Sequence, residues 1–176
     1  MIVRSAVPAD ASGIATVHVR GWQTAYRAIL SDALLDGLSV EQRTERWRRI
    51  LNDDAEHAGC TKVAELDGQI IGFVHNAPSR DDDADPSSVG ELIAIYVRPD
   101  AFGTGVGRAL MDAALDWFAA AGYLEATLWV LDGNARAIRF YERAGWTPDG
   151  TRKQDTIGDE PVTELRYRHP VSMHTR

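Results

Sequence analysis

The sequence is poor in the residue types that build disulfide frameworks, metal sites and cationic surfaces. Cys60 is the only cysteine among 176 residues, which excludes a disulfide framework and a metal set built on cysteines. His18 and His75 have no partner at metal-ligand spacing, so we interpret both as structural or surface residues. Lys and Arg number 19 against 26 Asp and Glu, and the net charge of −7 argues against nucleic acid or an anionic membrane as the main partner. We therefore expect no metal, no nucleic acid and a reducing cytoplasmic setting.

Long apolar runs are also missing. None approaches the roughly 20 residues that a membrane span needs, and Pro8, Asp10 and Gly13 interrupt the hydrophobic core of any signal peptide. Hydrophobic residues nevertheless make up 44% of the chain, which is enough for a packed core. With no internal repeat and no Gly/Ser linker, residues 1–176 are expected to form a single domain with no membrane partner.

Alternating strand and helix patterns predict an α/β fold with a mixed sheet. Asp67-Gly68 between two apolar runs is a strong signal for a two-residue hairpin turn. Residues 79–88 predict a polar, acidic loop, and the apolar run at 92–97 is typical of a strand buried on both faces. The expected strands cover residues 2–4, 61–66, 69–75, 92–97, 126–131 and 162–168, and the expected helices cover a stretch opening at Pro8 and residues 31–38, 40–51, 105–121 and 135–144.

The most informative segment joins the run at 92–97 to an amphipathic helix. It reads Arg98-Pro-Asp-Ala-Phe-Gly-Thr-Gly-Val-Gly-Arg-Ala-Leu-Met111, with glycines at 103, 105 and 107. Glycine lets the backbone approach a ligand closely, and the first N–H groups of a helix are unpaired, so the segment predicts a phosphate or pyrophosphate site. Neither a Walker A loop nor a Rossmann fingerprint fits, because Arg108 stands where each needs another residue. The alternative is a strand-to-helix turn with no ligand.

Two segments of the chain together resemble the signature of the GNAT superfamily of N-acetyltransferases. The first half of that signature, Arg/Gln-x-x-Gly-x-Gly/Ala after a Val-x-Pro-like strand end, is similar to Phe102-Gly-Thr-Gly105-Val-Gly107. Both glycines match, and Phe102 stands where Arg or Gln is usual.

The second half of the signature is matched more fully. The family pattern Asn-x-x-Ala-x-x-Phe-Tyr-x-x-x-Gly-Phe resembles the run from Asn134 to Trp146, in which Trp replaces the last Phe. The run from Val17 to Arg27, with Trp47 downstream, also resembles many bacterial members. The resemblance therefore covers nearly the whole chain, and its motifs do not specify an acceptor.

The resemblance implies a GNAT-type fold, a central twisted mixed sheet flanked by helices on both faces, with acetyl-CoA as cosubstrate. The strands at 92–97 and 126–131 should splay apart and hold the pantetheine arm between them, and Tyr141 should lie near the sulfur. The implied coenzyme contacts are the backbone of Ile95, Tyr96 and Val97, the amides of Gly103, Thr104, Gly105, Val106, Gly107 and Arg108, and Asn134.

Several of these side chains also have a purely structural interpretation. Asparagine is a favoured helix cap, so Asn134 caps the following helix, contacts the coenzyme, or does both. Tyr141 is either a core aromatic or a residue of the site. Trp22 and Tyr26 lie four residues apart on one helix face, where they either pack in the core or form a wall of the acceptor pocket.

The expected reaction is direct attack of an amine, on a small molecule or a peptide, at the thioester carbonyl through a tetrahedral intermediate. Most of the rate should come from positioning and from hydrogen-bond donors aimed at the oxyanion. Glu91 is the candidate base, acting directly or through water, unless it is an exposed charge at the start of a strand. Tyr141 is the candidate acid for the leaving sulfur.

Two other classes of protein stay open at this point. One is a non-catalytic coenzyme A-binding sensor. The other is an interaction module without the cofactor, which Phe102 favours because the family signature has Arg or Gln at that position. The acidic loop and Glu91 favour a cationic acceptor, although a charge run is more often a solvated loop. The sequence does not specify the acceptor, the acyl-chain preference or the oligomeric state, and a homodimer stays open.

Overall fold

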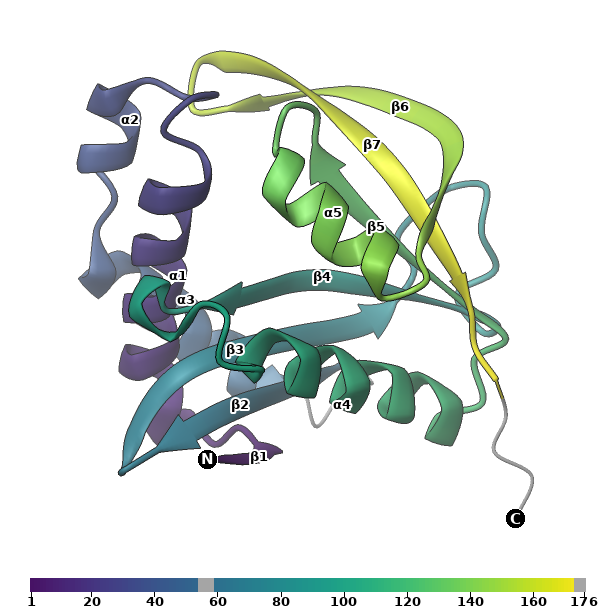
Figure 1. The fold of residues 1–176 in the computed structure, drawn as a ribbon, viewed down its shortest axis with the longest axis horizontal. Helices are drawn as coiled ribbons and strands as arrows, with labels where there is room; N and C mark the ends of the chain where they lie inside the picture. The colour runs from purple at the N-terminus through teal and green to yellow at the C-terminus, as the bar shows by residue number, and fades with distance from the viewer. Residues whose placement is uncertain (54–58, 173–176) are drawn as a thin grey trace.

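The computed structural model describes residues 1–53 and 59–172, whose fold is shown in Figure 1. No helix in these residues is long and apolar enough to span a bilayer. The elements in chain order are β1 (Ile2–Ser5), the 3-10 turn η1 (Pro8–Asp10), α1 (Ala11–Ala25), α2 (Asp32–Asp36), α3 (Val40–Asp53), β2 (Cys60–Leu66), β3 (Gln69–Pro78), β4 (Val89–Val97), the 3-10 turn η2 (Pro99–Ala101), α4 (Val106–Ala120), β5 (Glu125–Leu131), α5 (Ala135–Arg143), β6 (Thr147–Ile157) and β7 (Glu160–Pro170).

The strands form one seven-stranded sheet in the order β1-β2-β3-β4-β5-β7-β6. β4 and β5 run parallel, and each other neighbouring pair in the described residues is antiparallel. α4 supplies the crossover that a parallel pair needs. The predicted α/β class and the mixed sheet are confirmed.

Helices cover both faces of the sheet, as predicted. α4 and α5 lie on one face, in front of the sheet in Figure 1, and contribute Leu110 and Tyr141 to a core with Leu128 of β5. α1 and α3 cover the other face, where Ile14 and Trp47 belong to a second core cluster. β4 lies between these two cores, so any opening along its edge is enclosed by helices on both sides.

Local signals in the sequence correctly identify one turn and one helix cap. Asp67 and Gly68 have φ values of 52° and 74°, which is the backbone of a two-residue hairpin turn with positive φ at both positions. Ser31 caps α2, because its hydroxyl oxygen accepts a hydrogen bond from the Leu34 amide at 3.2 Å. Both features depend on a few neighbouring residues, which is why sequence alone predicts them.

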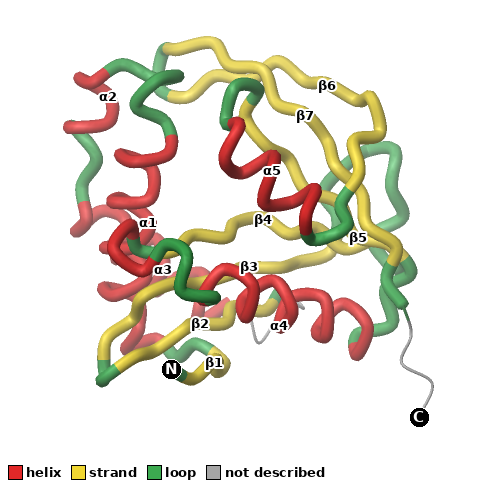
Figure 2. Tube along the Cα trace, in the orientation of Figure 1, coloured by secondary structure: helices red, strands yellow, loops and turns green. Residues whose placement is uncertain are grey.

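The C-terminal hairpin differs from the expectation of a single last strand. β6 precedes β7, and most of its residues are exposed, so the chain there has no apolar alternation to indicate a strand. Gly158-Asp159, the turn between the two strands, is the sequence signal that could have identified the hairpin. Figure 2 shows the hairpin extending over α5 toward α2, where the Ser31 amide donates to a Glu160 carboxylate oxygen at 3.0 Å.

The strand expected at 92–97 exists and is covered on both faces as predicted, but it has a partly exposed edge that the sequence pattern does not indicate. Residues 93–97 are only half-buried. Both faces are covered, since Ile95 packs against the α4–α5 core and Tyr96 against the α1–α3 core. The exposure comes instead from the edge of β4 that faces β5.

Candidate active site

β4 and β5 are paired along only part of their length. Residues 89–91 pair with residues 125–127, and beyond them the two strands separate. Ile93 forms a β-bulge at this point, because its neighbours Leu92 and Ala94 have partners in β3 and it has none. The predicted splay is confirmed, and it leaves the facing edges of both strands with backbone groups that the sheet does not use.

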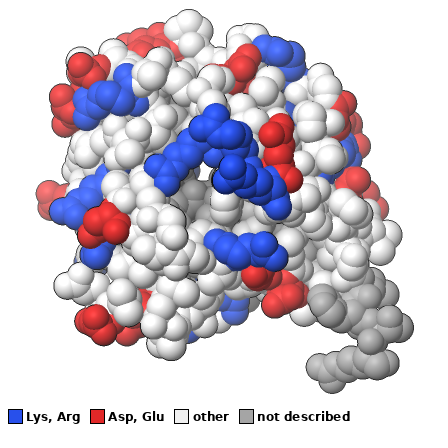
Figure 3. Space-filling view, viewed as in Figure 1, with Lys and Arg blue, Asp and Glu red and all other residues white. Residues whose placement is uncertain are grey.

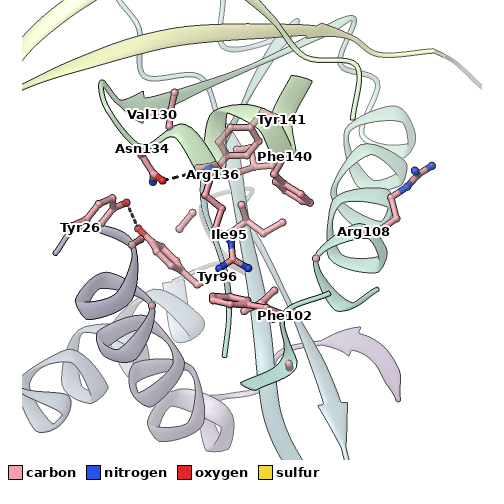
Figure 4. Close-up of a pocket in the computed structure, with 18 of the residues that line it drawn as sticks. Tyr26, Ile95, Tyr96, Phe102, Arg108, Val130, Asn134, Arg136, Phe140 and Tyr141 are labelled. Carbon is pink, nitrogen blue, oxygen red and sulfur yellow. Dashed lines mark hydrogen bonds between the residues drawn. The ribbon is translucent and has the colours of Figure 1, made fainter. Parts of the chain in front are cut away.

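A cavity of about 340 Å³ lies between the separated strands, and we call it the β4–β5 cavity. Its walls come from the end of α1, β4, the loop before α4, β5 and α5 (Figure 4). Eight of the predicted coenzyme residues line it: Ile95, Tyr96, Val97, Gly103, Gly105, Gly107, Arg108 and Asn134. Thr104 and Val106 are not among the lining residues: the Thr104 hydroxyl donates to the Ala101 carbonyl at 2.7 Å, and the Val106 side chain is buried in the core, although its amide belongs to the unpaired start of α4.

The glycine segment brings unpaired amides to one end of this cavity. Gly103 and Gly105 have φ values of 77° and 91°, which side chains disfavour. Gly105 is the N-cap of α4, and no side chain in the described residues caps this helix. The first hydrogen bond of the helix runs from the Ala109 amide to the Gly105 carbonyl at 3.0 Å. The amides of 106–108 come before it and have no acceptor within the helix. Free amides and the helix dipole together favour an anion here.

Arginine side chains gather on the face of the molecule that carries α5 and the start of α4, despite the net negative charge of the chain, and of those on α5 only Arg136 lines the cavity in the described residues. Arg136, Arg139 and Arg143 are exposed on α5, and Figure 3 shows basic side chains over α5 and the start of α4, around a hollow. Arg108 turns its side chain away from the cavity and donates to Asp112 at 2.8 Å. Arg136 instead extends toward Phe102, and its Cζ lies 3.4 Å from the ring centroid.

Three tyrosines from three elements line the cavity. The hydroxyls of Tyr26, at the end of α1, and Tyr96, on β4, are 2.8 Å apart (Figure 4). Tyr141 from α5 lines the same space, and its hydroxyl has no hydrogen-bond partner among the described residues. Burial raises the pKa of all three phenols above their ordinary value of about 10, so each hydroxyl keeps its proton at neutral pH. Gly21 permits this arrangement, since a Cβ there would come within 2.6 Å of the Tyr96 ring.

Asn134 serves as a helix cap and also reaches the cavity. Its Oδ1 accepts a hydrogen bond from the Ala137 amide at 3.3 Å, which confirms the cap. The residue is 7% exposed and lines the cavity. Asn134 is therefore placed to cap α5 and to contact a ligand in the cavity at the same time, and the coenzyme contact stays a prediction.

Glu91 lies at the point where β4 and β5 part, but it is not exposed and does not line the cavity. It is 3% exposed, so the interpretation as an exposed charge is wrong. Its carboxylate accepts from the Arg80 guanidinium at 2.7 and 3.0 Å and from the Arg80 amide at 3.2 Å. This pair raises the pKa of Arg80. Of the two routes considered for a base at this position, the one through water agrees better with the geometry.

Trp22 lies outside the cavity, whereas Tyr26 lines it. The Trp22 ring packs edge-on against Tyr26 at 5.2 Å and belongs to a core cluster with Leu30 and Leu35. Trp22 supports the tyrosine from behind, and core packing describes it better than a place in the pocket wall.

Both histidines have structural partners, as expected. The buried His18 ring accepts a hydrogen bond at Nδ1 from the Trp47 indole at 3.1 Å, and burial lowers the pKa of His18 to about 3. His75 Nδ1 lies 2.9 Å from the Thr61 hydroxyl. In residues 1–53 and 59–172, no three His, Cys, Asp or Glu side chains are grouped for a metal ion.

The acidic loop at 79–88 is fastened to the sheet by Arg166 of β7. The Arg166 guanidinium is buried and donates to Asp83 at 2.6 and 2.7 Å, to Asp149 at 2.7 Å and to Asp81 at 3.3 Å. The Trp129 indole donates to Asp81 at 2.9 Å, and Trp129 also lines the cavity. Asp81 and Asp83 therefore share the charge of Arg166, which weakens their support for a cationic acceptor.

Among the lining residues that the sequence analysis did not assign to the site are three with large side chains on β5 and α5: Trp129, Arg136 and Phe140. Arg136 and Phe140 lie inside the run from Asn134 to Trp146, and that motif was the available signal. Phe140 packs over Gly107, where a Cβ would come within 3.3 Å of its ring. Trp129 sits in an apolar strand, and nothing in its local pattern distinguishes it from a core residue.

Comparison with known proteins places this geometry in context. The profile of the Acetyltransferase (GNAT) family matches residues 22–146. An uncharacterized N-acetyltransferase from Bacillus subtilis (strain 168), YuaI, is 29% identical over 140 residues, which are 80% of this chain and 76% of that protein. A mycothiol acetyltransferase from Propionibacterium freudenreichii subsp. shermanii is 32% identical over 120 residues, 68% of this chain and 36% of that protein. This chain thus corresponds to about a third of that enzyme.

A solved structure extends the likeness to the fold. The PaiA N-acetyltransferase of Thermoplasma acidophilum, crystallised in complex with coenzyme A, has a TM-score of 0.77 at 19% sequence identity. The superposition covers 96% of this chain and 98% of that one, so it includes the sheet and the helices around the β4–β5 cavity.

Proposed function

Because the chain belongs to the Acetyltransferase (GNAT) family, we propose that it transfers an acetyl group from acetyl-CoA to an amine of a small molecule or a peptide. Family membership establishes the class of enzyme. The donor, the acceptor class and the roles of individual residues form the proposal.

The observation that carries the proposal is that one cavity joins two free strand edges to an uncapped helix N-terminus. Coenzyme A has an amide-containing arm that ends in a thiol and a diphosphate further along the molecule. The strand edges offer backbone donors and acceptors to the arm, and the helix N-terminus offers amides to the diphosphate. This pairing of features suits an extended ligand with one anionic end.

The residues present fit such a ligand. The amides of 106–108 would hold the diphosphate, and the positive φ values of Gly103 and Gly105 keep the preceding turn open to it. The backbone of Ile95 and Val97 would pair with the arm, and Asn134 would contact the coenzyme from the other side of the cavity. The PaiA N-acetyltransferase, which has a similar fold, was crystallised in complex with coenzyme A, and this supports coenzyme A as the ligand.

Acetyl-CoA supplies the acyl group as a thioester, which an amine can attack. Tyr141 is the proposed acid for the departing sulfur, since its hydroxyl lines the cavity, has no partner in the described residues and keeps its proton at neutral pH. Burial of the phenol also keeps bulk water from competing for its hydrogen bond.

Glu91 remains the proposed base for the ammonium form of the acceptor, working through water. It lies in the last pair before the strands separate and does not line the cavity, but the next residue of β4, Leu92, does. Arg80 occupies part of its hydrogen-bonding capacity, and a carboxylate has about four acceptor positions, so room is left for a water molecule.

The acceptor side of the cavity is aromatic. Tyr26 and Trp129 line it, and the hydroxyl pair of Tyr26 and Tyr96 can orient an amine by accepting its N–H. The nearby carboxylates of Asp81 and Asp83 are bound to Arg166, so we assign no charge preference to the acceptor.

Thermal unfolding with and without acetyl-CoA tests the proposal at low cost. A ligand that binds only the folded state should stabilise it by about 2.7 kcal/mol at 100 times its Kd. No stabilisation at millimolar acetyl-CoA would reject the proposal and favour an interaction module. Stabilisation without release of free thiol in the presence of amines would favour the coenzyme A-binding sensor.

A further inference from the structure

Arg136 and Phe102 connect the two sides of the β4–β5 cavity. Phe102 precedes the glycine segment on the β4–α4 side, and Arg136 stands in the first turn of α5 on the β5 side. The Arg136 Cζ lies 3.4 Å from the centroid of the Phe102 ring, and Figure 4 shows the side chain descending from α5 onto it. Both residues line the cavity, so this contact lies at its opening.

The charge of Arg136 is not neutralised by a neighbour. Arg108 and Arg98 pair with Asp112 and Asp100, whereas no carboxylate in the described residues lies within salt-bridge distance of Arg136. Stacking on a ring uses the face of a guanidinium and leaves the N–H groups at its edge available. Arg136 therefore presents unused donors and a full positive charge beside the glycine segment.

Residue 102 is also where the chain lacks a polar side chain. The resemblance described above has Arg or Gln at this position, and Phe102 can neither donate a hydrogen bond nor carry charge. The amides of 106–108 supply donors with only partial charge. A charge-assisted hydrogen bond to phosphate is stronger than a cation–π contact at an exposed site, so the edge N–H groups would supply most of the affinity for a diphosphate while the ring keeps the guanidinium in place.

We propose that Arg136 is the side-chain ligand of the coenzyme diphosphate, and that Phe102 holds it beside the glycine segment in place of the donor that position 102 lacks. The inference rests on the proposed function, because it presumes that coenzyme A occupies the cavity. It assigns a specificity role to α5: Arg136 favours thioester donors that carry a diphosphate over donors that end at pantetheine.

Calorimetry with coenzyme A and with acetyl-pantetheine, which lacks the diphosphate, tests this role. Arg136→Ala should weaken coenzyme A binding roughly tenfold to a hundredfold, as expected for one or two lost charge-assisted hydrogen bonds, and should leave acetyl-pantetheine binding unchanged. Arg139→Ala removes another exposed arginine of the same helix and is the matched control, with an expected change of less than about twofold. Phe102→Leu should weaken coenzyme A binding about threefold, because it removes only the stacking surface.

Moving the guanidinium from position 136 to position 102 separates the role of Arg136 from a general effect on folding. Phe102→Arg combined with Arg136→Ala returns a guanidinium to the loop and should recover most of the lost affinity. Equal affinity of the Arg136 and Arg139 variants, equal weakening toward both ligands, or no recovery in the double variant would each overturn the inference. These results leave the proposed function intact if the unsubstituted protein binds coenzyme A, whereas failure of the unsubstituted protein to bind would overturn the proposed function itself.

Discussion

Arg80 donates two guanidinium hydrogen bonds to Glu91, although the two residues differ sharply in exposure. The Arg80 side chain is 66% exposed, and Glu91 is 3% exposed. The pair stands in the last row of β4 before the strands separate. Arg80 fixes this carboxylate, and the next residue of β4, Leu92, lines the cavity, so the position suits a base that acts through water.

Glu91→Gln should therefore lower turnover about a hundredfold, because it keeps the shape of the side chain and removes the base. Arg80→Ala is the companion variant. It should retain much of the turnover and lower the free energy of unfolding by about 1–2 kcal/mol, since the buried carboxylate loses two hydrogen bonds and keeps the Arg80 backbone amide. Steady-state kinetics and urea unfolding measure the two effects. Unchanged turnover in the Gln variant would exclude Glu91 as the base.

Tyr141→Phe removes a hydroxyl that has no partner in the described residues, so the fold should not suffer. Turnover should fall by about a hundredfold or more, with melting temperature and coenzyme A affinity little changed. Because burial raises the pKa of Tyr141, ionisation of this phenol should not reduce the rate at neutral or mildly alkaline pH. The comparison needs an acceptor for which chemistry limits the rate. A well-folded Phe variant with normal turnover would remove Tyr141 from the mechanism.

Gly105→Val tests the anion site at the start of α4. A Cβ at this position meets nothing within 4 Å, so the cost in stability comes from the φ of 91°, about 1–2 kcal/mol. Gly150→Val is a matched control, with a φ of 87° and open space around it, on β6 away from the cavity. Both variants should lose similar stability, but only Gly105→Val should weaken coenzyme A binding. Calorimetry that finds equal affinity in the two would contradict the assignment.

His18 should make the protein sensitive to mild acid. Its pKa is about 3 in the folded protein because of burial, against about 6.5 in the unfolded chain. Below the unfolded value the unfolded chain binds a proton that the folded protein does not, so stability falls as the pH drops from about 6.5 toward 3, by up to about 1.4 kcal/mol per pH unit. Urea unfolding at pH 6.5 and 5 should show a smaller loss in His18→Gln. An identical loss in both proteins would place the acid sensitivity elsewhere.

The fold was largely predictable because its elements carry local signals. The hairpin at Asp67-Gly68, the Ser31 cap and the glycine segment before α4 each depend on the φ preference or the hydrogen bond of a few neighbouring residues. β6 was not predictable in the same way, since its exposed residues show no alternation.

The site was predictable in outline and not in its ion pairs. The strand separation and the glycine segment follow from motifs, whereas the partners of Glu91, Asp83 and Phe102 come from other elements. Asp83 and Arg166 are 83 residues apart, and no local pattern in the sequence indicates that they meet. From the sequence alone, the acidic loop therefore favours a cationic acceptor. In the structure, Arg166 binds two of its carboxylates and holds the loop on the sheet.

We propose above that this chain moves an acetyl group from acetyl-CoA to an amine in the β4–β5 cavity. The most direct measurement combines a free-thiol assay with mass spectrometry of the products, across amino acids, polyamines, aminoglycosides and peptides with free N-termini. We expect that at least one amine gains an acetyl group, with one free thiol released per group transferred, and that Tyr141→Phe slows this release by about a hundredfold. A folded protein that neither binds coenzyme A nor releases thiol with any of these amines would contradict it.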